Sequence, residues 1–186
     1  MLIVGISGSL RRDSHNSRLL RAAARKLPPG VRLQVFDELA GIAPFDEDHE
    51  DRPTGPSLRR LRAAIAGADA VLVSTPEYNG SFPGQLKNAL DWVSRPLEGN
   101  PLHRRPVAVV GASTGIFGAV WAQADLRRVL TAIGAAVLDA ELAVGQAHAA
   151  FDLRGDLYDP ALDGALGALI AALVVAARSS AAAAAA

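Results

Sequence analysis

The sequence predicts one α/β domain in which a parallel sheet is covered by helices on both faces. Short apolar runs of strand length alternate along the chain with longer segments of helical periodicity. Most of these runs lack the polar alternation of a half-exposed strand, which indicates strands buried on both faces. With 186 residues, half of them hydrophobic, the chain is long enough for one substantial core and too short for two comfortable domains.

The expected elements follow in order. Strands are predicted at residues 2–6, 31–36, 70–74, 107–112 and 135–139. Helices are predicted at residues 19–27, 57–66, 83–93, 119–133 and 161–177. Ser81 is the expected cap of the third helix, with Pro83 in its first turn. Because parallel strands are joined by right-handed crossovers, the expected order of this five-stranded sheet is 2-1-3-4-5.

The domain is expected to occupy residues 1–178. The chain closes with Ser179, Ser180 and six alanines, which we interpret as an unstructured tail or a segment foreign to the natural chain. The apolar run from Ala165 to Ala177 is too short to span a bilayer, and no secretory signal is evident. A soluble cytoplasmic protein without membrane contact is therefore expected.

Charge and composition exclude several functions. The 19 basic and 19 acidic residues cancel, which argues against nucleic-acid binding and against a polybasic membrane tether. The absence of cysteine excludes disulfides, thiolate catalysis and sulfur-ligated metals. The acidic stretch Phe45–Asp51 could suggest a metal site, but consecutive acids in a loop are usually solvated, so no metal is predicted.

The loop after the first strand combines hydroxyl groups and positive charge just before a helix. Unpaired N–H groups and the helix dipole make such a helix start a favourable anion site. The candidate phosphate ligands are Ser9, Arg11 or Arg12, Ser14, Asn16 and Ser17. The alternative is that Ser14 or Asn16 merely caps the helix. The glycines do not form the dinucleotide-binding pattern, so Asp37, after the second strand, is interpreted as a loop residue and not as a ribose ligand.

Two further loops have the composition of a binding site for a flat ring. Pro76, Glu77, Tyr78, Asn79 and Gly80 follow the third strand, and Asn-Gly is also typical of an ordinary turn. Small residues and glycines, Ser113-Thr114-Gly115-Ile116-Phe117-Gly118, follow the fourth strand.

In the expected strand order these three loops meet in one crevice at the carboxyl edge of the sheet. A phosphate loop beside two loops that approach a planar ring is the pattern expected of a site for flavin mononucleotide, FMN.

Two stretches carry a resemblance to a known family. The first is Gly8-Ser9-Leu10-Arg11 with Ser14 and Asn16. The second is Thr75-Pro76-Glu77-Tyr78-Asn79-Gly80-Ser81 with Pro83, Leu86, Lys87, Asn88, Ala89, Asp91 and Trp92. Over roughly residues 2 to 145 the chain resembles the NADPH-dependent FMN reductases, which include quinone, chromate and azo-dye reductases. The resemblance implies a flavodoxin-like three-layer fold, bound FMN, NAD(P)H as electron donor, and a homodimer or homotetramer.

The same resemblance assigns roles to residues. It places Ser9, Arg11, Asn16 and Ser17, with Ser14, at the phosphate. Pro76, Glu77, Tyr78 and Asn79 line the isoalloxazine, and Ser113 with Gly115 contacts its far edge. Members commonly carry a Gly-Gly pair after the fourth strand, where this chain has Ser113 to Gly118. No residue is nominated as a proton-transfer catalyst, since the redox chemistry belongs to the flavin.

The predicted activity is hydride transfer from NAD(P)H through FMN to a quinone or another small acceptor, such as a flavin, an azo dye or chromate. The alternative is a flavodoxin-like electron carrier without NAD(P)H activity, although such carriers are strongly acidic. A receiver-type signalling domain would need aspartates where Ser7 and Thr75 stand. Five arginines either bind the 2′-phosphate of NADPH or face solvent, so the preference between NADH and NADPH stays open. They are Arg59, Arg60, Arg62, Arg104 and Arg105.

Overall fold

A computed structural model describes residues 1–50 and 55–185 of the chain. Its parallel sheet has the strand order β2-β1-β3-β4-β5, which confirms the predicted topology. The strands are β1 (Leu2–Ser7), β2 (Arg32–Phe36), β3 (Ala70–Thr75), β4 (Pro106–Ala112), β5 (Ala136–Val137) and β6 (Ala143–Val144). The helices are α1 (His15–Arg25), α2 (Pro56–Ala66), α3 (Gly84–Val93), α4 (Val120–Ala132) and α5 (Pro160–Ala185). Short 3₁₀ turns lie at Leu39–Gly41, Glu47–His49 and Leu97–Gly99.

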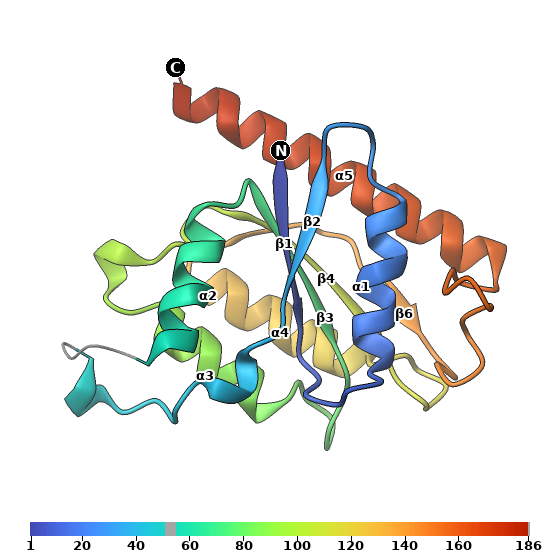
Figure 1. The fold of residues 1–186 in the computed structure, drawn as a ribbon, viewed down its shortest axis with the longest axis horizontal. Helices are drawn as coiled ribbons and strands as arrows, with labels where there is room; N and C mark the ends of the chain where they lie inside the picture. Colours follow the sequence, from blue (N-terminus) through green and yellow to red (C-terminus); the bar gives the residue numbers. More distant parts are fainter. Residues whose placement is uncertain (51–54, 186) are drawn as a thin grey trace.

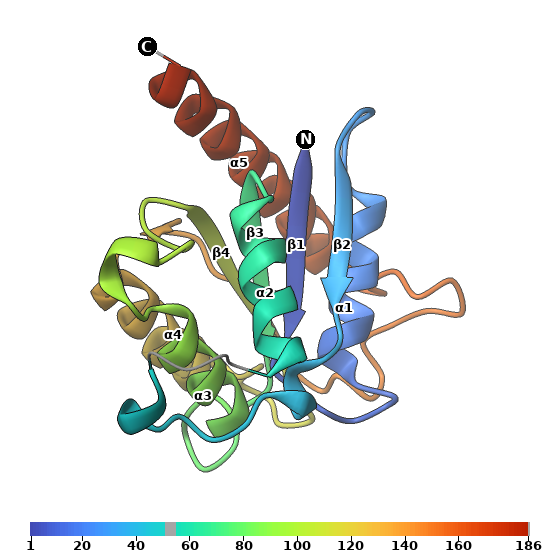
Figure 2. The same cartoon turned by 60° about the vertical axis from the view of Figure 1, so that its left-hand side comes forward.

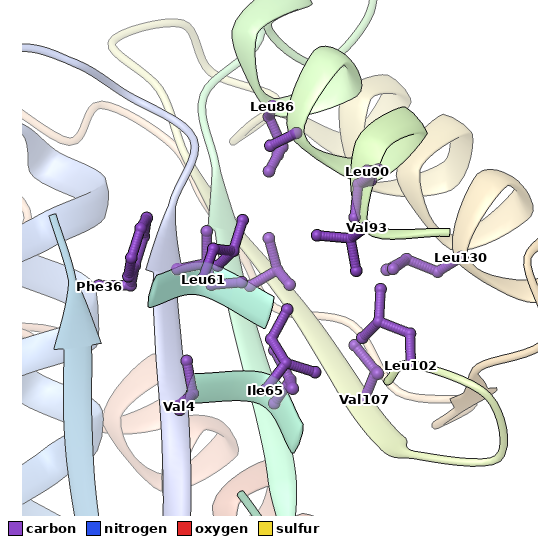
Figure 3. Packing of buried hydrophobic residues seen from close by; sticks show 14 of the residues in the cluster. Val4, Phe36, Leu61, Ile65, Leu86, Leu90, Val93, Leu102, Val107 and Leu130 are labelled. Atoms are coloured by element: carbon purple, nitrogen blue, oxygen red, sulfur yellow. The ribbon is translucent and has the colours of Figure 1, made fainter. Parts of the chain in front are cut away.

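The helices form a layer on each face of the sheet (Figures 1 and 2). Helices α1 and α5 cover one face, while α2, α3 and α4 cover the other. Strands β3 and β4 are buried along their whole length, as continuous apolar runs predict. Within β3, Val71 and Val73 point to the α2–α4 side, whereas Leu72 points to the α1–α5 side. In Figure 3, Leu61 and Ile65 of α2 pack above the strands beside the side chains of α3 and α4.

The fifth position of the sheet differs from the prediction. In place of one strand at 135–139, two short strands pair with β4 in succession, β5 at its start and β6 at its end. The connecting segment carries Asp139 and Glu141, whose carboxylates accept hydrogen bonds from the Arg127 guanidinium at 2.8 and 3.3 Å. These acidic side chains connect the segment between β5 and β6 to α4.

The last helix also runs further than the sequence suggested. The prediction of an unstructured tail at 179–186 was wrong for residues 179–185, because α5 continues to Ala185. Alanine has the highest helix propensity of all residues, so a terminal alanine run extends a helix that packing has already formed. The expectation that the apolar run is too short to span a bilayer was wrong, because by length and composition alone Pro160–Ala183 could cross a membrane. In this structure Leu166, Ile170 and Leu173 are buried against the sheet, and 33% of the candidate span is buried in all.

Helix starts were predicted with mixed success. The Ser14 hydroxyl caps α1 by accepting the N–H groups of Asn16 and Ser17 at 3.1 and 3.3 Å. The predicted cap of α3 was wrong: Pro83 occupies the cap position, and the Ser81 hydroxyl donates instead to Asp125 on α4 at 2.8 Å. In the acidic stretch, Asp46 caps the short turn Glu47–His49, and Asp51 lies outside the described residues.

Candidate functional site

The loops that follow β1, β3 and β4 meet at the carboxyl edge of the sheet, because these three strands are neighbours. They enclose a cavity of about 100 Å³, called here the central cavity. Its lining residues are Ser9, Arg11, Ser14, His15, Asn16, Pro76, Glu77, Tyr78, Ala112, Ser113 and Thr114. Most of the predicted site residues are therefore brought together. Ser17 lines an adjacent cavity, while Asn79, Gly80 and Gly115 do not line the central one.

Asn16 connects the start of α1 to two of the three strand ends. Its side-chain amide donates to the Ala112 carbonyl at 2.9 Å, and its oxygen accepts from the Ala112 N–H at 3.0 Å and from the Ser74 hydroxyl at 2.8 Å. The residue is 2% exposed, so these bonds form away from water. The Asn16 side chain thus ties the start of α1 to the ends of β3 and β4. Its contact with a cofactor stays a prediction.

Hydroxyl groups order the loop between β1 and α1, which is the predicted phosphate loop. The Ser17 hydroxyl donates to Ser7 at 3.2 Å, and the N–H of Arg11 points to the Ser9 hydroxyl at 3.4 Å. The Arg11 side chain is exposed, and no ion pair among the described residues involves it. An uncompensated guanidinium beside the amino end of α1 is a suitable donor set for a phosphate group.

His15 also lines the central cavity, and sequence reasoning missed it. Burial lowers its pKa from the ordinary histidine value, and the positive charges of Arg11 and Arg18 lower that pKa further. Its Nδ1 is buried and has no partner among the described residues. An anionic ligand would offset the positive charges of Arg11 and Arg18 beside this partly buried imidazole. The only feature of the sequence that pointed to His15 as a site residue was its position between the candidate ligands Ser14 and Asn16.

The loop after β3 contains the turn that its Asn-Gly pair allows. The backbones of Tyr78 and Ser81 exchange hydrogen bonds of 2.9 and 3.2 Å around Asn79 and Gly80. Both central residues have positive φ, 53° and 77°, the conformation that Asn and Gly tolerate best. The turn leaves the Tyr78 ring half exposed at the edge of the central cavity.

Glu77 connects this loop to α4. Its carboxylate oxygen Oε2 accepts the N–H groups of Trp121 and Ala122, each at 3.1 Å. The cap residue of α4, Ala119, has φ of 64° and no side chain that could cap the helix. Glu77 therefore caps the helix from a distant loop, and Ser81–Asp125 is a second tie between the same two elements. Sequence reasoning placed Glu77 at a cofactor ring and did not foresee this bond.

The loop after β4 is fixed by a close approach to the segment that contains β6. A Cβ added at Gly145 would lie 2.3 Å from the Ile116 carbonyl oxygen, and one at Gly118 would lie 2.5 Å from the backbone of Ala143. The Gly115 carbonyl accepts the Gln146 N–H at 2.9 Å. The glycines of this loop thus allow backbone to approach backbone. A contact of Gly115 with a cofactor stays a prediction.

Together, the sheet order and the position of the cavity define a flavodoxin-like protein whose three strand-end loops enclose one site. The family model described as NADPH-dependent FMN reductase matches residues 1–149, and the chain belongs to this family. Its cofactor is FMN, and the residues present fit that group, because a free guanidinium and a helix start adjoin a cavity walled by two further loops.

Named relatives agree with the family. The chain is 43% identical to an NAD(P)H-dependent FMN reductase of Pseudomonas aeruginosa over 158 residues, 84% of each chain. It is 36% identical to a quinone reductase of Escherichia coli over 138 residues, 74% of this chain and 73% of that one. A solved structure, the flavoenzyme NAD(P)H:(acceptor) oxidoreductase FerB of Paracoccus denitrificans, superposes with a TM-score of 0.85. That comparison covers 96% of this chain and 97% of FerB at 33% identity.

Proposed function

We propose that this protein oxidises NAD(P)H through bound FMN and reduces a quinone or a similar small acceptor. The observation that carries the proposal is the convergence of the loops after β1, β3 and β4 on one cavity. Membership of the FMN reductase family and the similarity to quinone reductases support the same activity.

The phosphate of FMN is assigned to the amino end of α1. Ser9, Arg11 and Ser17 supply its side-chain contacts, while Ser14 and Asn16 hold the loop in shape through the bonds described above. The charge of Arg11 complements the phosphate and is not consumed by an ion pair within the described residues. Backbone N–H groups at the start of α1 can also donate hydrogen bonds to the phosphate. Ser14 and Asn16 contribute by holding these N–H groups in position.

The ring of FMN is assigned to the space between the loops at 76–80 and 113–115. When bound, FMN accepts a hydride from NAD(P)H and passes reducing equivalents to an acceptor. Pro76 and Tyr78 position the backbone of the first loop, and Glu77 secures that loop to α4. Backbone N–H groups of this loop favour negative charge that develops beside them. No side chain of this chain is assigned a proton-transfer role.

The colour of the purified protein tests the cofactor assignment. We expect a yellow protein that releases FMN, not FAD, on denaturation, because one phosphate loop is present. A colourless protein that takes up no FMN at micromolar concentration would contradict the assignment.

Steady-state kinetics test the reaction. Donor and acceptor share one open site, so we expect parallel lines in double-reciprocal plots with NAD(P)H and a quinone. The electron-carrier alternative predicts the opposite: reduced protein would pass electrons to a protein partner and would not be reduced by NAD(P)H.

A homodimer or homotetramer is proposed from the exposed aromatic surface beside the site. Ile116, Phe117 and Trp121 are 69%, 58% and 51% exposed, and the two aromatic rings meet edge to face at 5.0 Å. A grouped apolar surface of this kind favours association. Trp92, by contrast, packs in the core against Phe45. A stable monomer in sedimentation at tens of micromolar would contradict this proposal. A cytoplasmic location is proposed from membership of this enzyme family.

A further inference from the structure

A second and larger cavity lies on the other side of the phosphate loop, between α1 and the end of β2. We call this space of about 450 Å³ the arginine cavity. Its polar wall contains Arg11, Arg12, Arg21 and Asp37. Its apolar wall is formed by Val35, Phe36, Leu39 and Ala40. Strand β2 and helix α1 lie side by side in both views of the fold (Figures 1 and 2).

Two arginines of this wall, Arg12 and Arg21, are free to bind an anion. Within the described residues, neither Arg12 nor Arg21 takes part in an ion pair or a side-chain hydrogen bond to a neighbour. Other arginines of α1 are occupied: Arg18 stacks over the Phe151 ring at 5.3 Å, and Arg25 binds Asp156 at 2.7 Å. Arg12 and Arg21 therefore leave positive charge uncompensated at one cavity.

The arginines that sequence reasoning considered for a 2′-phosphate are placed differently. Arg60 pairs with Glu38, and Arg62 donates to the carbonyls of Val93 and Gly99 at 2.9 and 2.8 Å. Arg104 and Arg105 precede β4, at the edge of the sheet opposite the strand ends that form the site. None of these four lines the arginine cavity.

The arginine cavity adjoins the site assigned to FMN. An outer cavity of about 400 Å³, which includes Tyr78 and Gln85, shares Leu10 and Arg11 with the arginine cavity. The same outer cavity shares Arg11 and Tyr78 with the central cavity. The three cavities thus form a row along the surface from Tyr78 past Leu10 to Arg12 and Arg21, which a long ligand could follow.

We propose that the arginine cavity binds the adenosine end of the electron donor, and that Arg12 and Arg21 recognise the 2′-phosphate of NADPH. This inference rests on the proposed function. An adenine ring suits the apolar wall of Val35, Phe36 and Ala40, and a dianionic phosphate suits two free guanidinium groups. Asp37 lies on the same wall and would repel a phosphate, but Arg12 and Arg21 together outweigh its single negative charge, so NADPH is favoured over NADH.

Direct binding tests the site without relying on turnover. The FMN-saturated protein is titrated calorimetrically with adenosine 2′,5′-bisphosphate and with adenosine 5′-monophosphate, which lacks the 2′-phosphate. Loading with FMN first prevents the probes from occupying the flavin phosphate loop. We expect the bisphosphate to bind at least about tenfold more tightly, and the Arg12→Ala/Arg21→Ala double variant to lose that difference.

Arg154→Ala/Arg178→Ala is the matched control, because it removes the same charge from exposed arginines that line none of the three cavities. It should keep the bisphosphate preference. Equal affinity for the two probes in the wild type, or an unchanged preference in Arg12→Ala/Arg21→Ala, would overturn the proposal. A parallel loss of FMN affinity in that variant would also overturn it, since the arginines would then belong to the flavin phosphate site.

Failure of the proposed adenosine site can be distinguished from failure of the proposed FMN-dependent activity. FMN uptake is read from flavin absorbance, and the adenosine probes are read by heat. A protein that takes up FMN and oxidises NADPH but shows no preference for the bisphosphate keeps its proposed function and loses this site.

Discussion

The cap that Glu77 provides to α4 can be tested by replacing it with alanine. The substitution leaves the N–H groups of Trp121 and Ala122 without their acceptor, and the first turn of α4 has no other side-chain cap. Loss of an N-cap costs about 0.5–2 kcal/mol, and loss of a negative charge at a helix start adds about 0.3–1 kcal/mol. Because the Trp121 N–H is solvent-exposed and water can replace part of the bond, we expect a total near 1–2 kcal/mol.

Thermal unfolding of the FMN-free protein measures this loss. For a domain of this size the expected fall in Tm is roughly 2–8 °C. Glu77→Gln keeps an acceptor oxygen and loses only the charge, so it should lie between wild type and Glu77→Ala. Glu98→Ala removes an exposed carboxylate elsewhere and serves as the charge-matched control. FMN affinity should fall in the same order, since the loop at 76–80 loses its tie to α4. If Glu77→Ala melts with the Glu98→Ala control and binds FMN as wild type does, the cap has no energetic role.

Three further predictions concern the phosphate loop. Arg11→Ala should weaken FMN binding by roughly 10- to 150-fold, the effect of losing charge-assisted hydrogen bonds of about 1.5–3 kcal/mol, while riboflavin affinity measured in parallel stays unchanged. Equal weakening of both flavins would show that Arg11 does not bind phosphate, and Arg12→Ala should change FMN affinity far less. Asn16→Ala should lower the free energy of unfolding by about 2–5 kcal/mol in urea denaturation, because it leaves buried hydrogen-bonding groups of Ser74 and Ala112 unpaired; a loss below about 1 kcal/mol would contradict this. The His15 pKa, which is lowered in the folded chain, should rise when FMN is added, since a phosphate anion stabilises the imidazolium. The unfolded chain takes up this proton first as the pH falls, so His15 reduces the stability of the FMN-free protein below the ordinary histidine pKa, and FMN affinity should increase over the same range. Titration followed by NMR checks both states, and an unchanged His15 pKa would place the phosphate elsewhere.

Local patterns in the sequence were sufficient for the strand order and for the meeting of three loops. Buried strands such as Ala70–Thr75 are continuous apolar runs, and parallel strands with helical crossovers leave few topologies open. The Asn79-Gly80 turn was visible for the same reason, since its chemistry is confined to neighbouring residues.

Contacts between distant parts of the chain were not visible in the sequence. Asn16 looked like a ligand or a cap, but its side chain bonds to Ser74 and Ala112, 58 and 96 positions away. Glu77 accepts a hydrogen bond from Trp121 of α4, which lies 44 positions away in the sequence. No local pattern predicts that Ala119 occupies the cap position of α4, where its side chain cannot cap the helix. The bonds from Arg127, in the preceding helix, to Asp139 and Glu141 between β5 and β6 are likewise contacts that no local pattern predicts.

The loop that follows β4 approaches the segment containing β6 so closely that it limits which residues can replace its glycines. At Gly145 and Gly118 even a methyl group would meet backbone atoms, which cannot rotate away as a flexible side chain would. No atom lies within 4 Å of a Cβ added at Gly84, Gly164 or Gly167, so other residues should be tolerated at these three positions. In a randomised library selected for bound flavin, the first pair should return almost only glycine, while the other three should accept many residues. Two glycines with no assigned contact to the cofactor would then be as intolerant of change as the residues that touch it.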